Sequence, residues 1–343
     1  MPDVPDVPEV PVERPPRAWR VRRLGPPARA LGLETSAPAA PGAGAARVEV
    51  EAVGLNLPDL LVCAGRYQER PPPPFSPGFE AAGTVVDAGP GSAWRPGQRV
   101  IVVPELPNGS FQESITVPDG QLYPVPPSMP APTAATFHIA YQTAHFALHR
   151  RAALQEGETV VVTGAAGGVG AATVQLARGA GARVVAVVRG GGKAAACRAW
   201  GADEVVDVAG GTDFAGAVRE LTGGAGAGVV VDVVGGEVAD QARRCVAFEG
   251  RLVVVGFAGG GIESVPANHV LLRNYSVVGL HLARYRRENP ALLRSVHAQL
   301  VSMWEAGAIS PPIYRVLPFE AAVAGLEIIA RREAVGRVVL ATG

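Results

Sequence analysis

The 343-residue chain lacks a charge excess of either sign. Its 31 lysines and arginines equal its 31 aspartates and glutamates, so the formal net charge is +0 at pH 7. A chain without a net field has no general attraction to nucleic acid or to anionic lipid. We therefore expect a small-molecule ligand and no nucleic-acid partner.

Cysteines are few and long apolar runs are absent. Cys63, Cys197 and Cys245 form no C-x-x-C pair, which is typical of a reduced intracellular chain without disulfides. No apolar run reaches the ~18 residues of a membrane span. The acidic, proline-rich start has neither the basic nor the apolar segment of a signal peptide. We therefore expect a cytoplasmic protein with no membrane partner.

Proline is absent from residues 133 to 265. Of the 31 prolines, 26 precede this window and five follow it, whereas 25 of the 43 glycines lie from Gly157 to Gly261. A hydrophobic content of 48% supplies a substantial core, so the division indicates two domains. The first 16 residues carry a proline at almost every third position and are expected to form a flexible extension.

Two styles of hydrophobic pattern predict two kinds of sheet. Short alternating segments between Pro/Gly turns, at residues 47–53, 83–86 and 98–103, indicate a mainly β domain. Valine-rich runs without alternation indicate parallel strands buried on both faces, at residues 159–163, 183–188, 204–207, 228–234, 251–256 and 276–280. Helices are expected at residues 171–179 and 290–306, and a last helix and strand within 318–340. The predicted fold class is α/β: a Rossmann-type doubly wound parallel sheet plus a mainly β domain.

A glycine-rich loop at residues 164–170 lies between a valine strand and an Ala/Leu helix. In that context, glycines let a pyrophosphate approach the helix N-terminus, where free N–H groups and the helix dipole favour anions. A tight turn with no ligand is the alternative. The loop residues predicted to bind the cofactor are Ala166, Gly167, Gly168, Val169 and Gly170.

The end of the second valine strand carries no acidic residue of the kind that binds both ribose hydroxyls of NAD. Arg189 and Lys193 instead place two cations where an additional 2′-phosphate would lie. The pattern favours NADPH over NADH, and the alternative is that both side chains are solvated surface cations.

These motifs, in this order and spacing, resemble the zinc-independent quinone oxidoreductases of the medium-chain dehydrogenase/reductase superfamily over residues 17–343. The matching stretches are GLNLPD (54–59), GRY (65–67), PGFEAAG (77–83), GQRV (97–100), QTA (142–144), GAAGGVG (164–170), Lys193, GAD (201–203), VGG (234–236) and GRVVL (336–340). The resemblance implies a GroES-like catalytic domain from residues 17–138 and 284–343, a Rossmann domain at 139–283, an active-site cleft between them and a homodimer.

The resemblance also implies roles for single residues on the substrate side. Tyr67 matches the aromatic position that faces the nicotinamide, where its hydroxyl would donate to the substrate oxygen or relay the proton; packing against prolines 71–74 is the alternative. Asn56 would orient substrate or ribose, or only hold its own turn. Thr143 would contact the nicotinamide side of the cofactor, or only pack within its helix.

Other implied contacts follow strand ends of the Rossmann sheet, where the ligand crevice opens. Arg332 resembles a basic residue near the 2′-phosphate pocket, or is a solvated helix arginine, while Val208 replaces a tyrosine often found near that phosphate. The segment after the last strand is expected to border the substrate through His281, Arg284 and Tyr285. The strand-end residues expected at the cofactor are Val234, Gly235, Gly256, Phe257 and Ala258.

Metal ligands are missing where zinc-dependent relatives carry them. Asn56 lies near the position of a cysteine and Phe79 at that of a histidine, and neither offers a usable zinc ligand. His145 and His149, an i, i+4 pair with His138 nearby, fit ordinary helix histidines better than a metal site. No metal is predicted.

Without a Lewis acid, reduction to an unactivated alcohol is disfavoured because nothing strong stabilises the alkoxide. A quinone or an α,β-unsaturated carbonyl gives a delocalised anion for which a few hydrogen-bond donors suffice. The predicted function is therefore zinc-independent, NADPH-dependent reduction of quinones or activated alkenes. The alternatives are a specialised biosynthetic enoyl reductase or reductive cyclase of the same fold, and a non-redox NADPH-binding protein.

Overall fold

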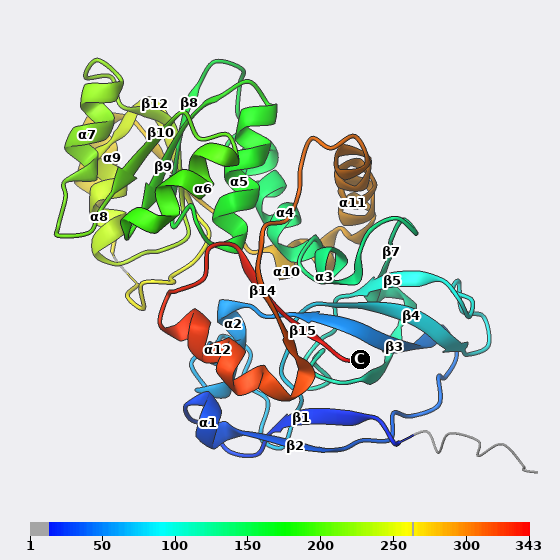
Figure 1. Cartoon of the computed structure of the whole chain (residues 1–343). Helices are drawn as coiled ribbons and strands as arrows, with labels where there is room; N and C mark the ends of the chain where they lie inside the picture. The colour runs from blue at the N-terminus through cyan, green and yellow to red at the C-terminus, as the bar shows by residue number, and fades with distance from the viewer. Residues whose placement is uncertain (1–13, 263) are drawn as a thin grey trace, which may run out of the picture.

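The computed structural model describes residues 14–262 and 264–343, which form two units, each built on a β-sheet (Figure 1). The predicted flexible extension lies, up to residue 13, outside the described residues. Arg14, within that predicted segment, forms an ion pair with Glu113 at 2.7 Å. The chain just after residue 13 is therefore anchored to the β-rich unit.

The upper unit in Figure 1 is a six-stranded parallel sheet in the order β10-β9-β8-β11-β12-β13. The chain runs outward from central β8 through β9 and β10, then returns to β11 on the other side, which is the Rossmann arrangement and confirms the predicted sheet. Its strands are β8 (Thr159–Thr163), β9 (Arg183–Val188), β10 (Glu204–Asp207), β11 (Ala227–Asp232), β12 (Val246–Val254) and β13 (Ser276–Gly279).

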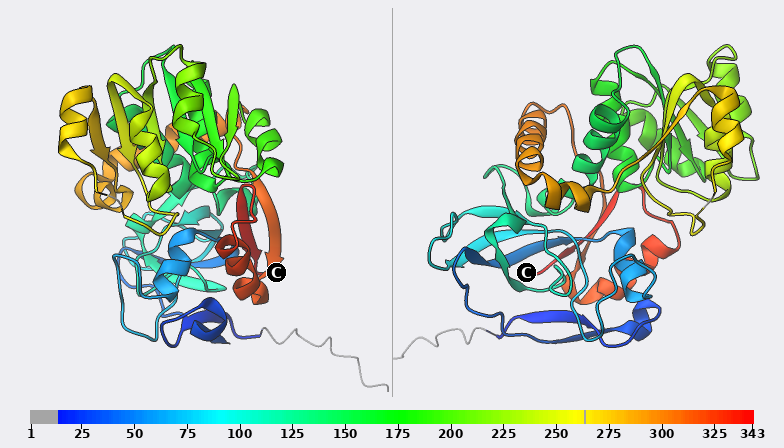
Figure 2. Two further views of the ribbon diagram at one scale, coloured as in Figure 1. Left: turned by 90° about the vertical axis from the view of Figure 1, so that its left-hand side faces the viewer. Right: turned by 180° about the vertical axis from the view of Figure 1, so that it is seen from behind.

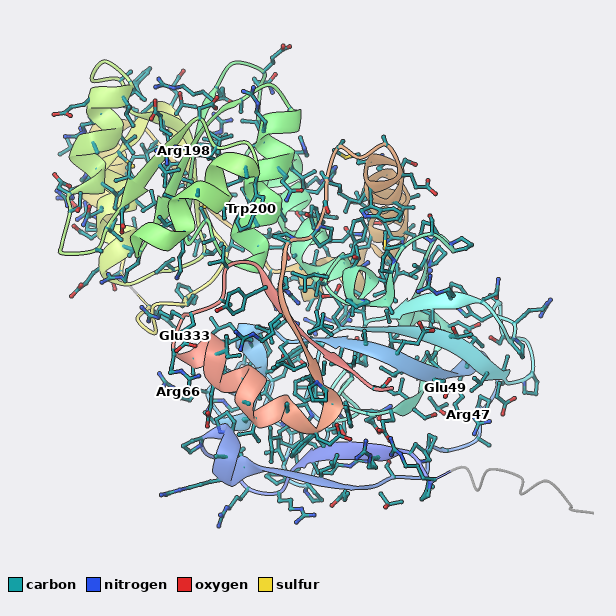
Figure 3. The ribbon with its side chains drawn as sticks, in the orientation of Figure 1. Arg47, Glu49, Arg66, Arg198, Trp200 and Glu333 are labelled. Atoms are coloured by element: carbon teal, nitrogen blue, oxygen red, sulfur yellow. The ribbon has the colours of Figure 1, made fainter. Side chains whose placement is uncertain are left out.

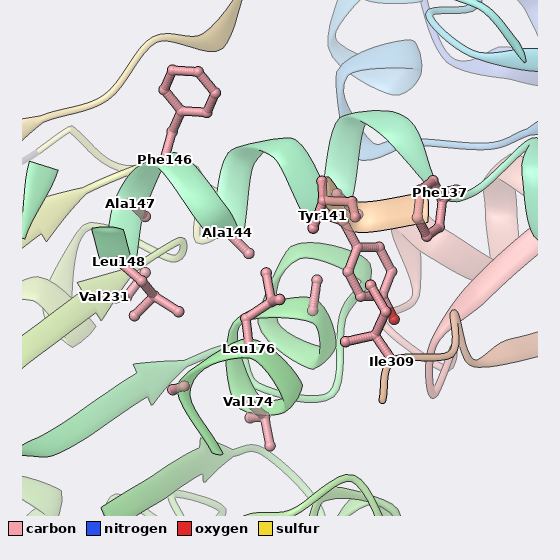
Figure 4. Packing of buried hydrophobic residues seen from close by; sticks show 14 of the residues in the cluster. Phe137, Tyr141, Ala144, Phe146, Ala147, Leu148, Val174, Leu176, Val231 and Ile309 are labelled. Carbon is pink, nitrogen blue, oxygen red and sulfur yellow. The ribbon is translucent and has the colours of Figure 1, made fainter. Parts of the chain in front are cut away.

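Helices cover both faces of this sheet because its valine runs are apolar at every position. Val160 and Val162 belong to the core under α4 (His138–His145) and α5 (Gly168–Gly179), whereas Val161 belongs to the core on the opposite face. Figure 4 shows the first of these cores where α4 crosses α5. The remaining helices of this unit are α6 (Ala194–Ala199), α7 (Phe214–Leu221), α8 (Glu237–Arg244) and α9 (Ala267–Arg273), with a 3-10 turn, η3 (Gly191–Lys193).

The lower unit is a seven-stranded sheet assembled from both ends of the chain. β15 (Arg337–Ala341) pairs antiparallel with β3 (Ala45–Gly54), so the C-terminus completes a sheet begun by the N-terminal half (Figure 2). This sheet also contains β4 (Ala81–Ala88), β5 (Arg99–Val102), β6 (Ser114–Pro118), β7 (Leu122–Pro124) and β14 (Ile313–Pro318). A separate antiparallel pair is formed by β1 (Arg17–Val21) and β2 (Leu31–Thr35).

Further helices join and flank the two units. They are α1 (Pro27–Ala30), α2 (Leu57–Cys63), α3 (Ala131–Ala134), α10 (Leu282–Glu288), α11 (Pro290–Glu305) and α12 (Ala322–Ala330), with 3-10 turns η1 (Asp119–Gln121) and η4 (Phe319–Ala321) and a π-helix, η2 (Phe146–Arg151). Within residues 14–262 and 264–343, none of the helices has the length and apolar character needed to cross a membrane. The domain boundaries after residues 138 and 283 stay predictions.

Candidate functional site

The glycine-rich loop leads from the end of β8 directly into α5. Gly164 has a φ of +58°, a conformation that favours glycine, and α5 begins at Gly168 rather than at residue 171 as predicted. A Cβ atom on Gly170 would lie 2.3 Å from the carbonyl oxygen of Gly164, so only glycine lets the first helical turn pack on the loop. The open N–H groups of that turn form an anion-binding end of the helix.

Arg337, at the start of β15, lies against this loop and was not singled out from the sequence. A Cβ atom on Gly168 would lie 2.5 Å from Arg337 Cδ, and the Gly336 N–H donates to the Ala166 carbonyl at 2.8 Å. The Arg337 side chain is 7% exposed, and its Nε and Nη2 atoms have no hydrogen-bond partner among the described residues. Burial lowers its pKa, yet a guanidinium stays charged in proteins. A cation beside a helix N-terminus suits a diphosphate, and Nη1 is the guanidinium nitrogen nearest Gly168.

Two buried carboxyl groups, Asp59 and Glu80, accompany Arg337, and we call the three residues the buried triad. Glu80 Oε2 lies 3.5 Å from Arg337 Nη2, and Glu80 Oε1 accepts the Ile139 N–H at 3.0 Å. Asp59 Oδ2 accepts the Asn56 N–H at 2.6 Å. Burial raises the pKa of each carboxyl to about 7, although Arg337 acts in the opposite direction. The sequence signal that could have indicated Glu80 and Arg337 is a charged residue directly before an apolar strand, as in PGFEAAG and GRVVL.

Two of the residues predicted at the 2′-phosphate, Lys193 and Arg332, lie beside the strand-end residue Ala258, and the three come from separate segments. Lys193 Nζ donates to the Arg332 carbonyl at 2.8 Å, and Arg332 Nη2 lies 3.5 Å from the Ala258 carbonyl. Arg332 has a φ of +58°, which directs the chain back at the end of α12. Burial and the charge of Arg332 lower the pKa of Lys193. Figure 3 shows Glu333, the next residue, just beyond α12. The structure thus brings Lys193, Arg332 and Ala258 together.

Arg189, the other predicted cation, lines a depression formed by the loops that follow β9, β10 and β11. The other lining residues are Val208, Gly211, Thr212, Phe214, Glu237, Val238 and Gln241. Lys193 does not line this depression, but the charges of Arg189 and Lys193 both act on Asp207 at the end of β10.

The strand-end residues form one edge of the crevice, organised by Asp232. Its carboxylate accepts the Thr163 hydroxyl at 2.5 Å and the Val234 N–H at 3.0 Å. It also accepts the Gly235 N–H at 3.2 Å. The loop after β12 lies on this turn, because Ala258 N–H donates to the Val233 carbonyl at 3.1 Å. The predicted residues Val234, Gly235, Gly256, Phe257 and Ala258 therefore lie on adjoining loops.

The predicted substrate-side residues lie around α2 and α4. The Tyr67 ring packs edge-on against Phe79 with centroids 5.3 Å apart, and burial raises the Tyr67 pKa to about 12. The Asn56 side chain donates to the Gly54 carbonyl at 3.0 Å, and the Thr143 hydroxyl donates to the Ile139 carbonyl at 2.7 Å. Both side chains thus make local contacts, and Tyr67 is a protonated donor at neutral pH.

The segment after β13 reaches the loop that carries Tyr67. Gln68 Nε2 lies 3.1 Å from His281 Nε2, and Tyr285 packs on Phe146 with ring centroids 4.6 Å apart. The contact between Gln68 and His281 joins the β-rich unit to the Rossmann unit beside Tyr67.

The histidines do not form a three-ligand cluster. His138 Nδ1 lies 3.2 Å from His297 Nδ1 in the protein interior, while the rings of His145 and His149 lie 4.7 Å apart. Within the described part of the chain, no three His, Cys, Asp or Glu side chains gather as a metal site requires.

Comparisons with known proteins agree with this architecture. The family "Alcohol dehydrogenase GroES-like domain" matches residues 42–127, and "Zinc-binding dehydrogenase" matches residues 168–298. Quinone oxidoreductase-like protein 2 of Bos taurus is 39% identical over 297 residues, covering 86% of this chain and 84% of that protein.

Solved structures are similar over most of the chain. The mycobacterial protein Rv1454c complexed with NADPH has 30% identity and a TM-score of 0.88, covering 95% of this chain and 100% of that one. The CurF ER cyclopropanase from the curacin A biosynthetic pathway has 25% identity and a TM-score of 0.86, covering 96% and 100%. The chain belongs to the quinone oxidoreductase-like family of the medium-chain dehydrogenase/reductase superfamily, whose members are nicotinamide-dependent oxidoreductases.

Proposed function

We propose that this protein is an NADPH-dependent reductase of quinones or α,β-unsaturated carbonyls that works without zinc. The observation that carries the cofactor choice is the convergence of Lys193 and Arg332 beyond β9, a strand whose end bears no acidic residue. Two cations suit a phosphate better than a ribose diol, and the nearby carboxylate of Asp207 accepts the N–H groups of Gly190 and Ala209. The similar mycobacterial structure complexed with NADPH supports the same choice.

The chain's own residues supply binding and orientation. Arg337 and the first turn of α5 would bind the diphosphate, and Lys193 with Arg332 would bind the 2′-phosphate. The nicotinamide, when bound, supplies hydride. The hydroxyl of Tyr67, whose pKa of about 12 keeps it protonated, would donate a hydrogen bond to the substrate oxygen. The described residues offer no three-ligand metal cluster, so an electron-poor substrate with a delocalised product anion suits this site.

The test is NADPH oxidation measured against a panel of quinones and enones, with NADH in parallel. We expect turnover with several acceptors and a higher kcat/KM for NADPH than for NADH. Elemental analysis should find no stoichiometric zinc. Equal use of the two cofactors, or one zinc per chain, would contradict the corresponding part of the proposal. A cytoplasmic location, expected from the few unpaired cysteines, is part of the same proposal.

A second candidate is a biosynthetic enoyl reductase or reductive cyclase, favoured by the similarity to the CurF ER cyclopropanase. This candidate differs from the first in its preferred substrate, because it would consume an enoyl thioester faster than any quinone. Mass spectrometry of the product separates simple reduction from ring formation. A non-redox role would show as tight NADPH binding without turnover of quinones, enones or enoyl thioesters.

A further inference from the structure

The buried triad holds more negative than positive groups. Asp59 and Glu80 are fully buried, and the charge of Arg337 acts on both carboxyls. Asp59 Oδ1 and Glu80 Oε2 have no hydrogen-bond partner among the described residues. With all three groups ionised, the triad carries one uncompensated negative charge in the protein interior, an arrangement that burial strongly disfavours.

The groups that face the triad come from five segments. Arg337 enters from β15, Asp59 from α2 and Glu80 from the residues before β4. The charge of Asp59 also acts on the Cys63 thiol at the end of α2 and on the Tyr67 hydroxyl in the loop that follows. Tyr141 faces it from α4, and its hydroxyl donates to Gln175 Oε1 at 3.0 Å. The charge of Arg337 acts on both carboxyls, and the Arg337 side chain also lies against Gly168 of the glycine-rich loop. The carboxyls and any anion in that loop therefore share one guanidinium.

We propose that binding of the nicotinamide dinucleotide is linked to uptake of one proton by the Asp59–Glu80 pair. This inference rests on the proposed cofactor site. A diphosphate at the α5 N-terminus would add negative charge near the carboxyls and attract the Arg337 guanidinium, whose Nη1 atom lies 2.8 Å from where a Cβ on Gly168 would be. The proton comes from solvent and binds a carboxyl oxygen, Asp59 Oδ1 or Glu80 Oε2, and no electrons move. Asp59 and Glu80 act as positioning residues, since their protonation fixes the charge around Arg337.

The sign of the linkage follows from the direction of the shift. Anion binding favours the neutral acid, so the pKa of the pair is higher in the complex than in the free protein. Cofactor affinity is therefore constant and highest below the free-state pKa. It falls as pH rises from the free-state to the bound-state value, by at most about tenfold per pH unit for one proton. Because burial raises the pKa of both carboxyls in the free protein, the fall is expected at a higher pH than for an exposed carboxyl.

The experiment is calorimetric titration of NADPH into the full-length protein at pH 7 in buffers of different ionisation enthalpy. The slope of observed heat against buffer enthalpy gives the number of protons exchanged. We expect Glu80→Gln and Asp59→Asn each to bind fewer protons than the wild type and to flatten the pH dependence of Kd. Any proton exchange at the 2′-phosphate is common to all variants and cancels in this comparison.

Glu113→Gln is the matched control, because Glu113 is also a buried carboxyl beside arginines. Burial would raise its pKa, but hydrogen bonds from Arg14 and Arg17 hold it at about 2, so it stays ionised. This variant should exchange as many protons as the wild type. Infrared difference spectra on NADPH addition should show a new carboxylic acid band that Glu80→Gln or Asp59→Asn removes.

Two outcomes count against the inference in different ways. NADPH binding with no difference in proton number between wild type and the two triad variants would overturn the inference and leave the proposed cofactor intact. No NADPH binding to the wild type would overturn the proposed cofactor and this inference with it.

Discussion

At the scale of single residues, the proposed site assigns separate cations to separate parts of the cofactor. Lys193→Ala would remove the proposed charge-assisted contact to the 2′-phosphate, worth about 1.5–3 kcal/mol. The KM for NADPH should then rise about 10- to 100-fold, with little change for NADH. Arg337→Lys should weaken both cofactors equally, because the diphosphate is common to them. Steady-state kinetics with both cofactors is the measurement, and an equal effect of Lys193→Ala on the two would refute the 2′-phosphate assignment.

Arg189→Ala tests the contribution of the second predicted cation, since Arg189 lines a depression that Lys193 and Arg332 do not line. We expect a smaller loss of NADPH preference than for Lys193→Ala. The double variant should approach equal KM values for NADPH and NADH. A larger effect of Arg189→Ala would indicate that the 2′-phosphate binds in that depression.

Tyr67→Phe tests the proposed donor to the substrate oxygen. The ring contact with Phe79 survives this change, so folding and cofactor affinity should be unaffected. The kcat with a quinone or enone should fall by about 100-fold or more if the hydroxyl stabilises the developing anion. Tyr314→Phe, on exposed β14, is the control and should keep full activity. Unchanged kcat in Tyr67→Phe would show that another group supplies the hydrogen bond.

At the scale of elements, helix α5 offers a matched pair of glycines. A Cβ on Gly170 would meet the Gly164 backbone at 2.3 Å, whereas one on Gly179 would meet nothing within 4 Å. Gly170→Ala should lower the free energy of unfolding by about 1–3 kcal/mol and weaken NADPH binding. Gly179→Ala should be neutral or stabilise the helix by up to about 1 kcal/mol. Chemical denaturation and calorimetry check both, and a wild-type Kd in Gly170→Ala would mean that the loop tolerates a shift.

The strands also show how much of the fold can be predicted from the sequence alone. The valine runs predicted the strands of the Rossmann sheet because burial on both faces requires apolar residues at every position, as Val160 and Val161 show. The β1–β2 pair was missed because its short segments are stabilised by contacts across the fold, such as the Trp19 indole N–H to the Phe319 carbonyl. The buried triad was missed for the same reason, since Asp59, Glu80 and Arg337 are far apart in sequence.

At the scale of the whole molecule, one edge of the Rossmann sheet is open and apolar. Among the described strands, β13 pairs only with β12, so its outer edge has no partner strand. Exposed apolar side chains gather beside it: Leu271 and Leu272 of α9 are 74% and 76% exposed, and Phe248 of β12 is 71% exposed. Asn274, which follows α9, accepts the Glu249 N–H at 2.8 Å and joins these elements into one surface.

A second copy of this chain is the occupant that we propose for this edge. Two β13 strands related by a twofold axis can pair antiparallel, and each copy then covers the apolar side chains of the other. Light scattering should give twice the 35.3 kDa chain mass for the wild type. Leu271→Glu with Leu272→Glu should give a folded monomer, because the charges would be buried unpaired in the interface. Val316→Glu, on β14 at the edge of the other sheet, should stay dimeric. A monomeric wild type, or a dimeric double variant, would place the contact elsewhere or exclude it.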